Sequence, residues 1–394
     1  MSSKFFDFLP LVALPFSTYK RECIRLFKML LLYYLQVFLE ALKSLPQFKI
    51  ITMKNNIHTD QALLSRREFV GKSTAALAGF ALVSSSAIGA PAIIRSWGKP
   101  NSKFGGVQIG VITYSFRSLP CNAEQILKYC IDCNISAIEL MGNTGEAFAG
   151  APHTTTEPRV GPPPSGPRPE PTAEQKAEQE QKAKEIAAWR STVSMDKFTQ
   201  LKKMYADAGV SIYAWKPNAL GEKNTDAEIE FALRSAKALG ASHVTVELPS
   251  NAAQSQRLGA LGAKHKIGIG YHGHLQQTFT AWDEALAQSK FNGLNCDIGH
   301  YVAAGLDPIP LIHAKHDRIY SMHVKDRKSK ANGGDNMPWG EGDTPITQVL
   351  QLMKKNKLKF PASIEMEYTV PENSDAVKEV ASCVEYCRRA LEAV

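Results

Sequence analysis

Carboxylate and imidazole side chains recur in the second half of this chain, each close to the end of a short apolar run. A buried carboxylate without a partner is costly, and a divalent cation offsets this cost when two or three acids and one or two imidazoles converge on it. Mixed oxygen and nitrogen ligands suit Mn, Co, Zn or Fe better than Ca or Mg. The pattern therefore predicts one divalent metal ion. The side chains concerned are Glu247, His272, His274, Asp297, His300, His323 and Glu365.

Residues so far apart in sequence need a framework that brings them together. From Gln108 onward, short apolar runs alternate with amphipathic stretches, which is typical of parallel strands joined by crossover helices. Eight such units in about 290 residues predict a single closed (β/α)8 or TIM barrel of the α/β class, rather than an open doubly wound sheet. The expected strands are Gln108–Tyr114, Ala137–Met141, Ser211–Lys216, His243–Leu248, Ile267–Tyr271, Leu294–Asp297, Ile319–Val324 and Ala362–Glu367.

Helix starts are also visible between these strands. Asn122, Ser194 and Asp226 can cap helices, while Asp307-Pro308 and Thr344-Pro345 put proline in a first turn. In a barrel of this kind the C-terminal strand ends carry the active site, which is where the acids and imidazoles above are expected.

One segment, residues 151–193, interrupts the alternation after the second strand. Its first part is rich in proline and its second part, from Ala173 to Arg190, is rich in Glu, Gln, Lys and Ala, which predicts an irregular excursion followed by a charged helix. An insertion after a strand end would lie on the catalytic face. It is either a lid or a solvated spacer.

The formal charge of +8 is concentrated at the N-terminus, because residues 1–92 hold 11 Lys and Arg but only 5 Asp and Glu. The rest of the chain is nearly neutral and shows no basic stripe interleaved with aromatic residues. A nucleic-acid partner is therefore not expected.

Residues 65–72, Ser-Arg-Arg-Glu-Phe-Val-Gly-Lys, resemble the twin-arginine export motif. An uncharged small-residue run follows, with candidate cleavage points near Gly89, Ala90 or Ala92. We expect export to the periplasm or another extracytoplasmic space, with no stable membrane insertion once the signal is removed.

Export signals normally stand at the N-terminus, so residues 1–52 fit poorly with this interpretation, and their apolar run is too short to span a bilayer comfortably. Our hypothesis is that translation starts at Met53. The expected organisation is an extension (1–52), a signal segment (53–92) and a catalytic barrel (93–394).

The seven cysteines do not form a metal-ribbon pattern. Cys130 and Cys133 have redox spacing, but they lie near the end of an expected helix rather than at its start. We interpret the cysteines as small packing residues.

Four motifs carry a resemblance to a known family. Ile135–Leu140, Gly270–His274, Asp297–His300 and His323–Asp326 resemble the sugar phosphate isomerase/epimerase family of xylose-isomerase-like barrels. The last three resemble its inosose-dehydratase-like and 3-keto-glycoside-processing branches. The similarity runs from Gln108 to the C-terminus and is interrupted by the insertion.

The resemblance implies a set of ligands. It marks Asp297, His323 and Glu365 as metal ligands, although Glu367 competes with Glu365 because both share one face of an ideal strand. The family's fourth ligand is usually a Glu on strand five. Here that strand ends in Tyr271-His272, so the fourth position stays open between Glu247 and His272.

It also implies chemistry at a carbon beside a carbonyl or hydroxyl, where the metal polarises two oxygens and a base removes the C–H proton. Glu139, His272 and His300 are the candidate bases and acids, and Lys325 is a candidate catalytic cation. Trp339 lies in a glycine-rich loop and either stacks on a sugar ring or covers the barrel top. The candidate substrate-binding residues are Tyr114, Lys216, His274, Arg327 and Trp339.

The expected function is a metal-dependent lyase, hydratase or isomerase of a small carbohydrate, and export favours an oxidised (3-keto) glycoside. An isomerase or epimerase of an unphosphorylated sugar is the alternative within this class. A non-catalytic periplasmic sugar-binding barrel is the alternative from another class. An endonuclease would need more histidines on the early strands and a basic face.

Overall fold

A computed structural model describes residues 98–159 and 170–393. Within these ranges eight parallel strands form a barrel, closed by the pairing of its first strand with its second and its last. A short antiparallel strand, β1 (Lys103–Phe104), extends the edge of the first. The barrel strands are β2 (Val107–Ile112), β3 (Ala137–Met141), β4 (Ser211–Lys216), β5 (His243–Glu247), β6 (Gly268–His272), β7 (Asn292–Asp297), β8 (Ile319–Val324) and β11 (Ala362–Ile364).

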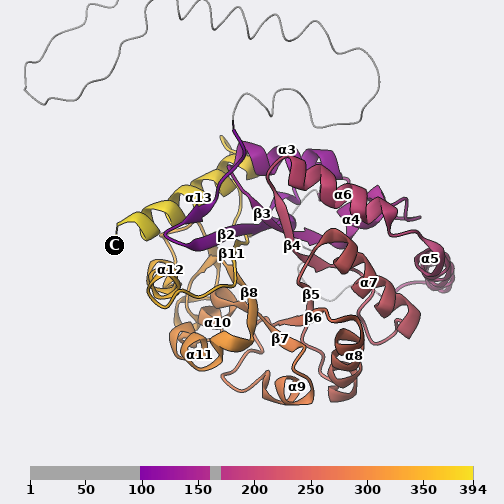
Figure 1. The fold of residues 1–394 in the computed structure, drawn as a ribbon. Helices are drawn as coiled ribbons and strands as arrows, with labels where there is room; N and C mark the ends of the chain where they lie inside the picture. Colours follow the sequence, from indigo (N-terminus) through magenta and orange to yellow (C-terminus); the bar gives the residue numbers. More distant parts are fainter. Residues whose placement is uncertain (1–97, 160–169, 394) are drawn as a thin grey trace, which may run out of the picture. The chain divides into compact units, whose positions relative to one another are not determined.

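Helices surround the strands as a ring (Figure 1). This arrangement confirms the predicted (β/α)8 barrel. The helices are α3 (Ala123–Asp132), α4 (Gly142–Phe148), α5 (Ala173–Thr192), α6 (Asp196–Asp207), α7 (Asp226–Leu239), α8 (Ala252–His265), α9 (Asp283–Gln288), α10 (Ile298–Ala303), α11 (Pro308–Lys315), α12 (Ile346–Lys355) and α13 (Ala376–Glu392).

Local sequence explains most helix starts. The side chain of Asn122 caps α3 and that of Asp307 caps α11, where proline occupies the first turn. Three expectations need correction. Thr225, not Asp226, caps α7 through a capping box. Met195 stands at the cap position of α6, while Ser194 accepts a hydrogen bond from the backbone N–H of Asp196, and Pro345 stands at the cap position of α12 instead of in its first turn.

The last strand is shorter than expected. It ends at Ile364, so Glu365 and Glu367 lie beyond β11 instead of on it. Both carboxylates nevertheless reach the same lysine, as described below.

The interior of the barrel is polar. The apolar core lies between the strands and the helices, whereas Glu139 of β3 is fully buried inside the barrel and accepts hydrogen bonds from the equally buried Thr245 of β5 and Asn295 of β7. Bonds between strands that are not neighbours must cross the inside of the barrel. Polar contacts therefore connect opposite walls, and every buried group needs its partner.

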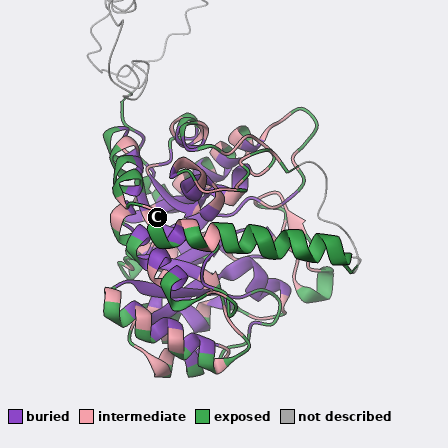
Figure 2. Cartoon of the chain, turned by 90° about the vertical axis from the view of Figure 1, so that its right-hand side faces the viewer, coloured by how far each residue is buried: buried purple, intermediate pink, exposed green. Residues whose placement is uncertain are grey.

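Helix α5 belongs to the insertion and is exposed along most of its length (Figure 2). Its C-terminal end is fixed by Arg190, which is 3% exposed and bonds to Glu146 of α4 and Glu228 of α7 at 3.0 Å each. Buried charges therefore anchor α5 at its C-terminal end, whereas the rest of the helix is exposed. Whether it acts as a lid or a spacer stays a prediction, and residues 160–169 lie outside the described residues.

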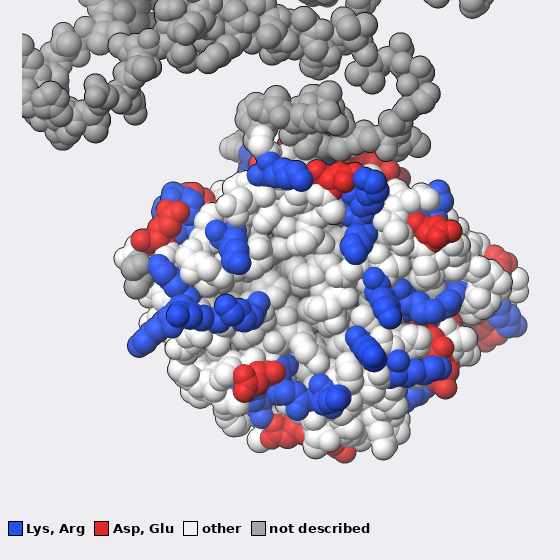
Figure 3. All heavy atoms as spheres, in the orientation of Figure 1, with Lys and Arg blue, Asp and Glu red and all other residues white. Residues whose placement is uncertain are grey.

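The surface and the cysteines add three observations. In Figure 3, Lys and Arg side chains are spread around one face of the barrel in separate groups, with Asp and Glu among them. All six cysteines of the described ranges are free, and five are buried, which confirms their packing role. No helix in the same ranges combines the length and hydrophobicity needed to cross a membrane. The twin-arginine segment and residues 1–52 lie outside the described residues.

We expect Arg190→Met to lower the free energy of unfolding by about 3–5 kcal/mol, because it leaves two buried carboxylates without their counter-charge. The control is Arg388→Met on α13, whose ion pairs with Glu385 and Glu392 are exposed and should contribute at most about 1 kcal/mol. Urea denaturation of both variants measures the difference. Equal losses would contradict the anchoring role.

Candidate metal centre

Four of the expected ligands come together at the C-terminal ends of neighbouring strands. His272 ends β6, Asp297 ends β7, His323 lies on β8, and Glu365 follows β11. Strand register fixes their level, because Asp297 pairs with His323 across β7 and β8. We call these four residues the ligand cluster.

The donor atoms of the ligand cluster converge. One ligand atom each from His272, Asp297 and His323 lies within 4.8 Å of the others. His323 Nδ1 is also 3.2 Å from Glu365 Oε2. Within the described residues, Asp297 Oδ2 and His323 Nδ1 are buried and make no hydrogen bond of good geometry. Their close neighbours are charged groups, with Lys325 Nζ 3.0 Å from Asp297 Oδ2.

Lys325 provides a counter-charge inside this cluster. Its ammonium is 2% exposed and lies 3.0 Å from Asp297, 2.8 Å from Glu365 and 2.7 Å from Glu367. Burial raises the pKa of Asp297 and would also raise that of Glu365, but Lys325 and His323 hold the pKa of Glu365 well below its usual value. Three carboxylates therefore share one ammonium.

Glu139 lies behind His323 and is fully buried. Its Oε2 accepts hydrogen bonds from His323 Nε2 at 2.8 Å and Asn295 Nδ2 at 3.2 Å, while Oε1 accepts one from Thr245 at 2.6 Å. Burial opposes ionisation, but His323, Lys216 and Thr245 together lower the pKa of Glu139 to about 2. Burial likewise opposes a charged His323, yet Glu139 and Glu365 raise its pKa to about 10.

His272 is a neutral imidazole. Burial, followed by the nearby His323 and Lys216, lowers its pKa to about 3. Its Nδ1 is 2.9 Å from Asn295 Oδ1, and its Nε2 is 3.9 Å from Asp297 Oδ2. Nε2 is therefore the nitrogen that faces the other ligands.

Glu247, the competing fourth ligand, has a different environment. Its side chain is 52% exposed and bonds to Lys216 at 3.0 Å and His274 at 3.2 Å. The hydrogen bond from His274 to this carboxylate raises the pKa of the imidazole. These three residues form a mouth group at the open end of the barrel, and His272 rather than Glu247 reaches the buried carboxylate of Asp297.

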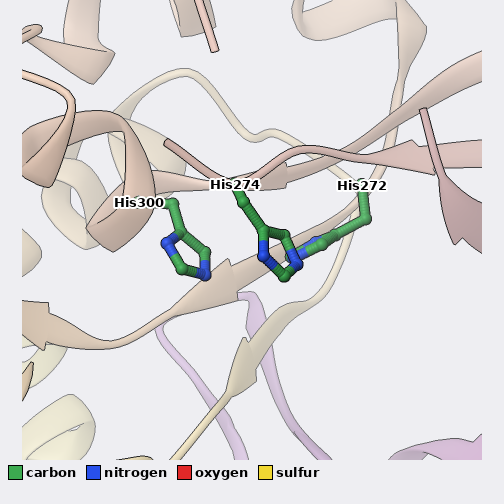
Figure 4. Close-up of side chains that lie close together, drawn as sticks. All are labelled: His272, His274 and His300. Atoms are coloured by element: carbon green, nitrogen blue, oxygen red, sulfur yellow. The ribbon is translucent and has the colours of Figure 1, made fainter. Parts of the chain in front are cut away.

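A second set of imidazoles, His272, His274 and His300, also has metal-ligand spacing (Figure 4). The rings of His274 and His300 stack with centroids 4.5 Å apart. However, Arg327 Nη1 lies 2.6 Å from His300 Nδ1, and an arginine can only donate. Burial and the neighbouring cations lower the pKa of His300, so the ring is neutral and its proton is on Nε2. His300 is thus better suited to donate a hydrogen bond than to bind a metal.

Comparison with known proteins agrees with the fold. The family described as xylose isomerase-like TIM barrel matches residues 176–387, which is more than half of the chain and includes the whole ligand cluster. This chain belongs to that family. No curated protein matches the chain.

Several solved structures resemble this barrel. A sugar phosphate isomerase/epimerase from Parabacteroides distasonis has 15% identity and a TM-score of 0.47, covering 73% of this chain and 96% of its own. The probable 3-DHS dehydratase AsbF from Bacillus anthracis has 14% identity and a TM-score of 0.48, covering 71% and 97%. IOLI protein with a bound zinc atom has 14% identity and a TM-score of 0.47, covering 72% and 99%. At these identities the likeness concerns the fold alone.

Two expected substrate contacts of this xylose isomerase-like barrel have other partners. Tyr114 lies in the 3-10 turn Thr113–Phe116, with the guanidinium of Arg117 4.7 Å from its ring centre. Trp339 is half-buried and meets Tyr386 of α13 edge to face, with centroids 5.6 Å apart. The contact supports a packing role for Trp339, although its binding of substrate stays a prediction.

Three structurally central residues were not singled out from the sequence. Asn295 and Thr245 bond to Glu139, and Asp326 fixes the loop that follows β8. For Asp326 the available signals were its place just after the strand-end histidine and the Gly-rich loop further along the chain. The buried carboxylate of Asp326 accepts hydrogen bonds from the backbone N–H groups of Gly340 at 2.8 Å, Gly342 at 3.0 Å and Thr344 at 3.2 Å.

Asp326→Asn should therefore lower the free energy of unfolding by about 1–3 kcal/mol, since an amide NH2 would face at least one of these donors. Asp343→Asn is the matched control, because Asp343 bonds to Ser329 and Asn332 in an exposed setting where water can replace it. Thermal denaturation compares them. A loss no greater than that of the control would contradict the role of Asp326.

Proposed function

We propose that this chain is a divalent-metal-dependent enzyme that acts on a sugar derivative by removing a proton next to a carbonyl. His272, Asp297, His323 and Glu365 would hold the metal. The observation that carries this proposal is that one ligand atom each from the buried residues His272, Asp297 and His323 lies within 4.8 Å of the others.

The donor set fits a divalent ion. It contains two carboxylates and two imidazoles, the mixed ligation that Mn, Co, Zn and Fe accept. A neutral His272 presents a lone pair toward Asp297 Oδ2 at 3.9 Å, so a metal ion between the two atoms could be bound by both. Glu139 supports the set as a carboxylate that orients a ligating histidine.

When bound, such an ion supplies Lewis-acid polarisation of substrate oxygens. The chain's own groups then have separate tasks. Glu139 and His272 use their polar atoms on neighbouring groups, which makes them poor candidates for the base. His300 carries its proton on Nε2 and can donate it to an oxygen on which charge develops. Lys216 and His274 can orient hydroxyl groups at the mouth.

The substrate class we propose is a 3-keto glycoside. The Glu247 carboxylate at the mouth would take the C2 proton, the C2–H electron pair would form a C1=C2 double bond, and the C1 substituent would leave with its bonding pair and take the Nε2 proton of His300. The twin-arginine pattern in residues 65–72 supports this choice, because an exported enzyme meets glycosides more readily than sugar phosphates. Isomerisation or epimerisation of an unphosphorylated sugar uses the same proton abstraction and is the second candidate.

Asp297→Asn should lose bound metal and turnover while the protein stays folded, since asparagine keeps the cap on α10 but removes the ligand charge. Asp307→Asn is the matched control, because Asp307 also caps a helix and lies outside the ligand cluster. Elemental analysis after incubation with Mn, Co, Zn or Fe and gel filtration measures occupancy. Normal occupancy in Asp297→Asn would remove this residue from the ligand set.

A substrate screen in deuterium oxide separates the reaction classes. We expect 3-keto-glucosides to release their C1 substituent, with NMR showing loss of the C2 proton. Deuterium incorporation into free ketoses or aldoses without bond cleavage would favour the isomerase or epimerase instead. Sugar binding in calorimetry with neither exchange nor cleavage would favour a binding protein.

A further inference from the structure

We propose that Asn295 is a positioning residue that sets the tautomer of His272 and holds Glu139 against His323, so that His272 turns Nε2 toward Asp297 and His323 turns Nδ1 toward Glu365. This inference rests on the proposed metal site. It adds a residue that contacts no substrate and no proposed ligand atom facing the ion.

The orientation of the Asn295 amide follows from its acidic neighbour. Glu139 can only accept, so the Asn295 atom 3.2 Å from its Oε2 must be the NH2 nitrogen. The same nitrogen lies 2.7 Å from Ser321 Oγ, which takes its second hydrogen. A flipped amide would bring the amide oxygen against the Glu139 carboxylate in a fully buried site.

The amide oxygen then determines the proton position on His272. It can only accept, and it lies 2.9 Å from His272 Nδ1, so Nδ1 carries the hydrogen. A neutral ring has one N–H, which leaves the lone pair on Nε2. That lone pair faces Asp297 Oδ2 at 3.9 Å, with no proton between them.

The far end of the network agrees with this direction. Ser321 accepts from Asn295, so its own hydroxyl proton is available to His243 Nε2 at 2.9 Å. His243 then carries its hydrogen on Nδ1, which is 2.9 Å from Ser242 Oγ, and Ser242 donates in turn to the carbonyl oxygen of Tyr213 at 3.2 Å. The assignment of His272 does not depend on this branch, because the Glu139 carboxylate alone fixes the orientation of the Asn295 amide.

His323 is positioned through the same amide. Asn295 and His323 both donate to Oε2 of Glu139, which fixes that oxygen from two sides. His323 therefore uses Nε2 for this bond and turns Nδ1 toward Glu365 at 3.2 Å. One buried amide thus orders two imidazoles on different strands.

The test measures imidazole tautomers by long-range 15N NMR on the full chain labelled at histidine, without metal, and assigns His272 from its loss in His272→Gln. We expect the Nδ1–H form in the wild type. In Asn295→Leu we expect a shift toward the Nε2–H form, together with cobalt or zinc affinity weakened about 10- to 100-fold. Calorimetric titration gives the affinity.

Asn292→Leu is the matched control. Asn292 is equally buried on the same strand, but its amide donates to the carbonyl oxygens of Ser255 and Ala285 outside the network. It should lose stability while keeping the His272 tautomer and the metal affinity.

The outcomes separate the two proposals. An Nε2–H tautomer of His272 in the wild type overturns the role of Asn295 even if metal binds, and this measurement stands if Asn295→Leu does not fold. Unchanged tautomer and affinity in a folded Asn295→Leu also overturn it. If wild-type His272 has the Nδ1–H form but cobalt and zinc do not bind, the metal proposal fails and the tautomer assignment holds.

Discussion

The ion pair between Glu139 and His323 is the interaction on which the rest of the site depends. A carboxylate with no solvent exposure at the centre of a barrel persists only if its oxygens are satisfied. Three donors from three other strands do this, and the bond to His323 is one of them. The charge that is costly to bury is thus the same charge that fixes a candidate ligand.

This arrangement separates the barrel into two chemical zones. Inside, the polar groups around Glu139 are engaged with one another, which favours rigidity and leaves little freedom for proton transfer. At the mouth, Lys216, Glu247 and His274 are partly exposed and can exchange partners with a substrate. Proton chemistry is therefore better suited to the mouth and to His300 than to Glu139.

The fold was predictable because parallel strands buried on both faces leave continuous apolar runs in the sequence. Three strands, including Ser211–Lys216, were predicted to the residue. Residues at strand ends were predictable as a group, since the barrel brings C-terminal ends together. The partners of each residue were not, because the bond between Glu139 and His323 joins positions 184 apart in sequence. Nothing in the sequence around Asn295 marks its role, because that role depends on the partners that its amide oxygen and nitrogen meet in the folded barrel.

A histidine at position 272, rather than the glutamate that the sequence resemblance implies there, changes the charge of the ligand cluster. Once a metal displaces the Nδ1 proton of His323, two carboxylates and two neutral imidazoles would carry two negative charges, which a divalent ion balances. Lys325 would then be needed less by Asp297 and Glu365, and its contact with Glu367, the shortest of the three at 2.7 Å, would dominate. A third carboxylate in place of His272 would leave the set more negative and would favour harder ions. The imidazole instead favours Zn, Co or Fe, and it works as a ligand only while its Nε2 is free of a proton. The use of His272 as a ligand therefore depends on the Asn295 amide, which holds the proton of this imidazole on Nδ1.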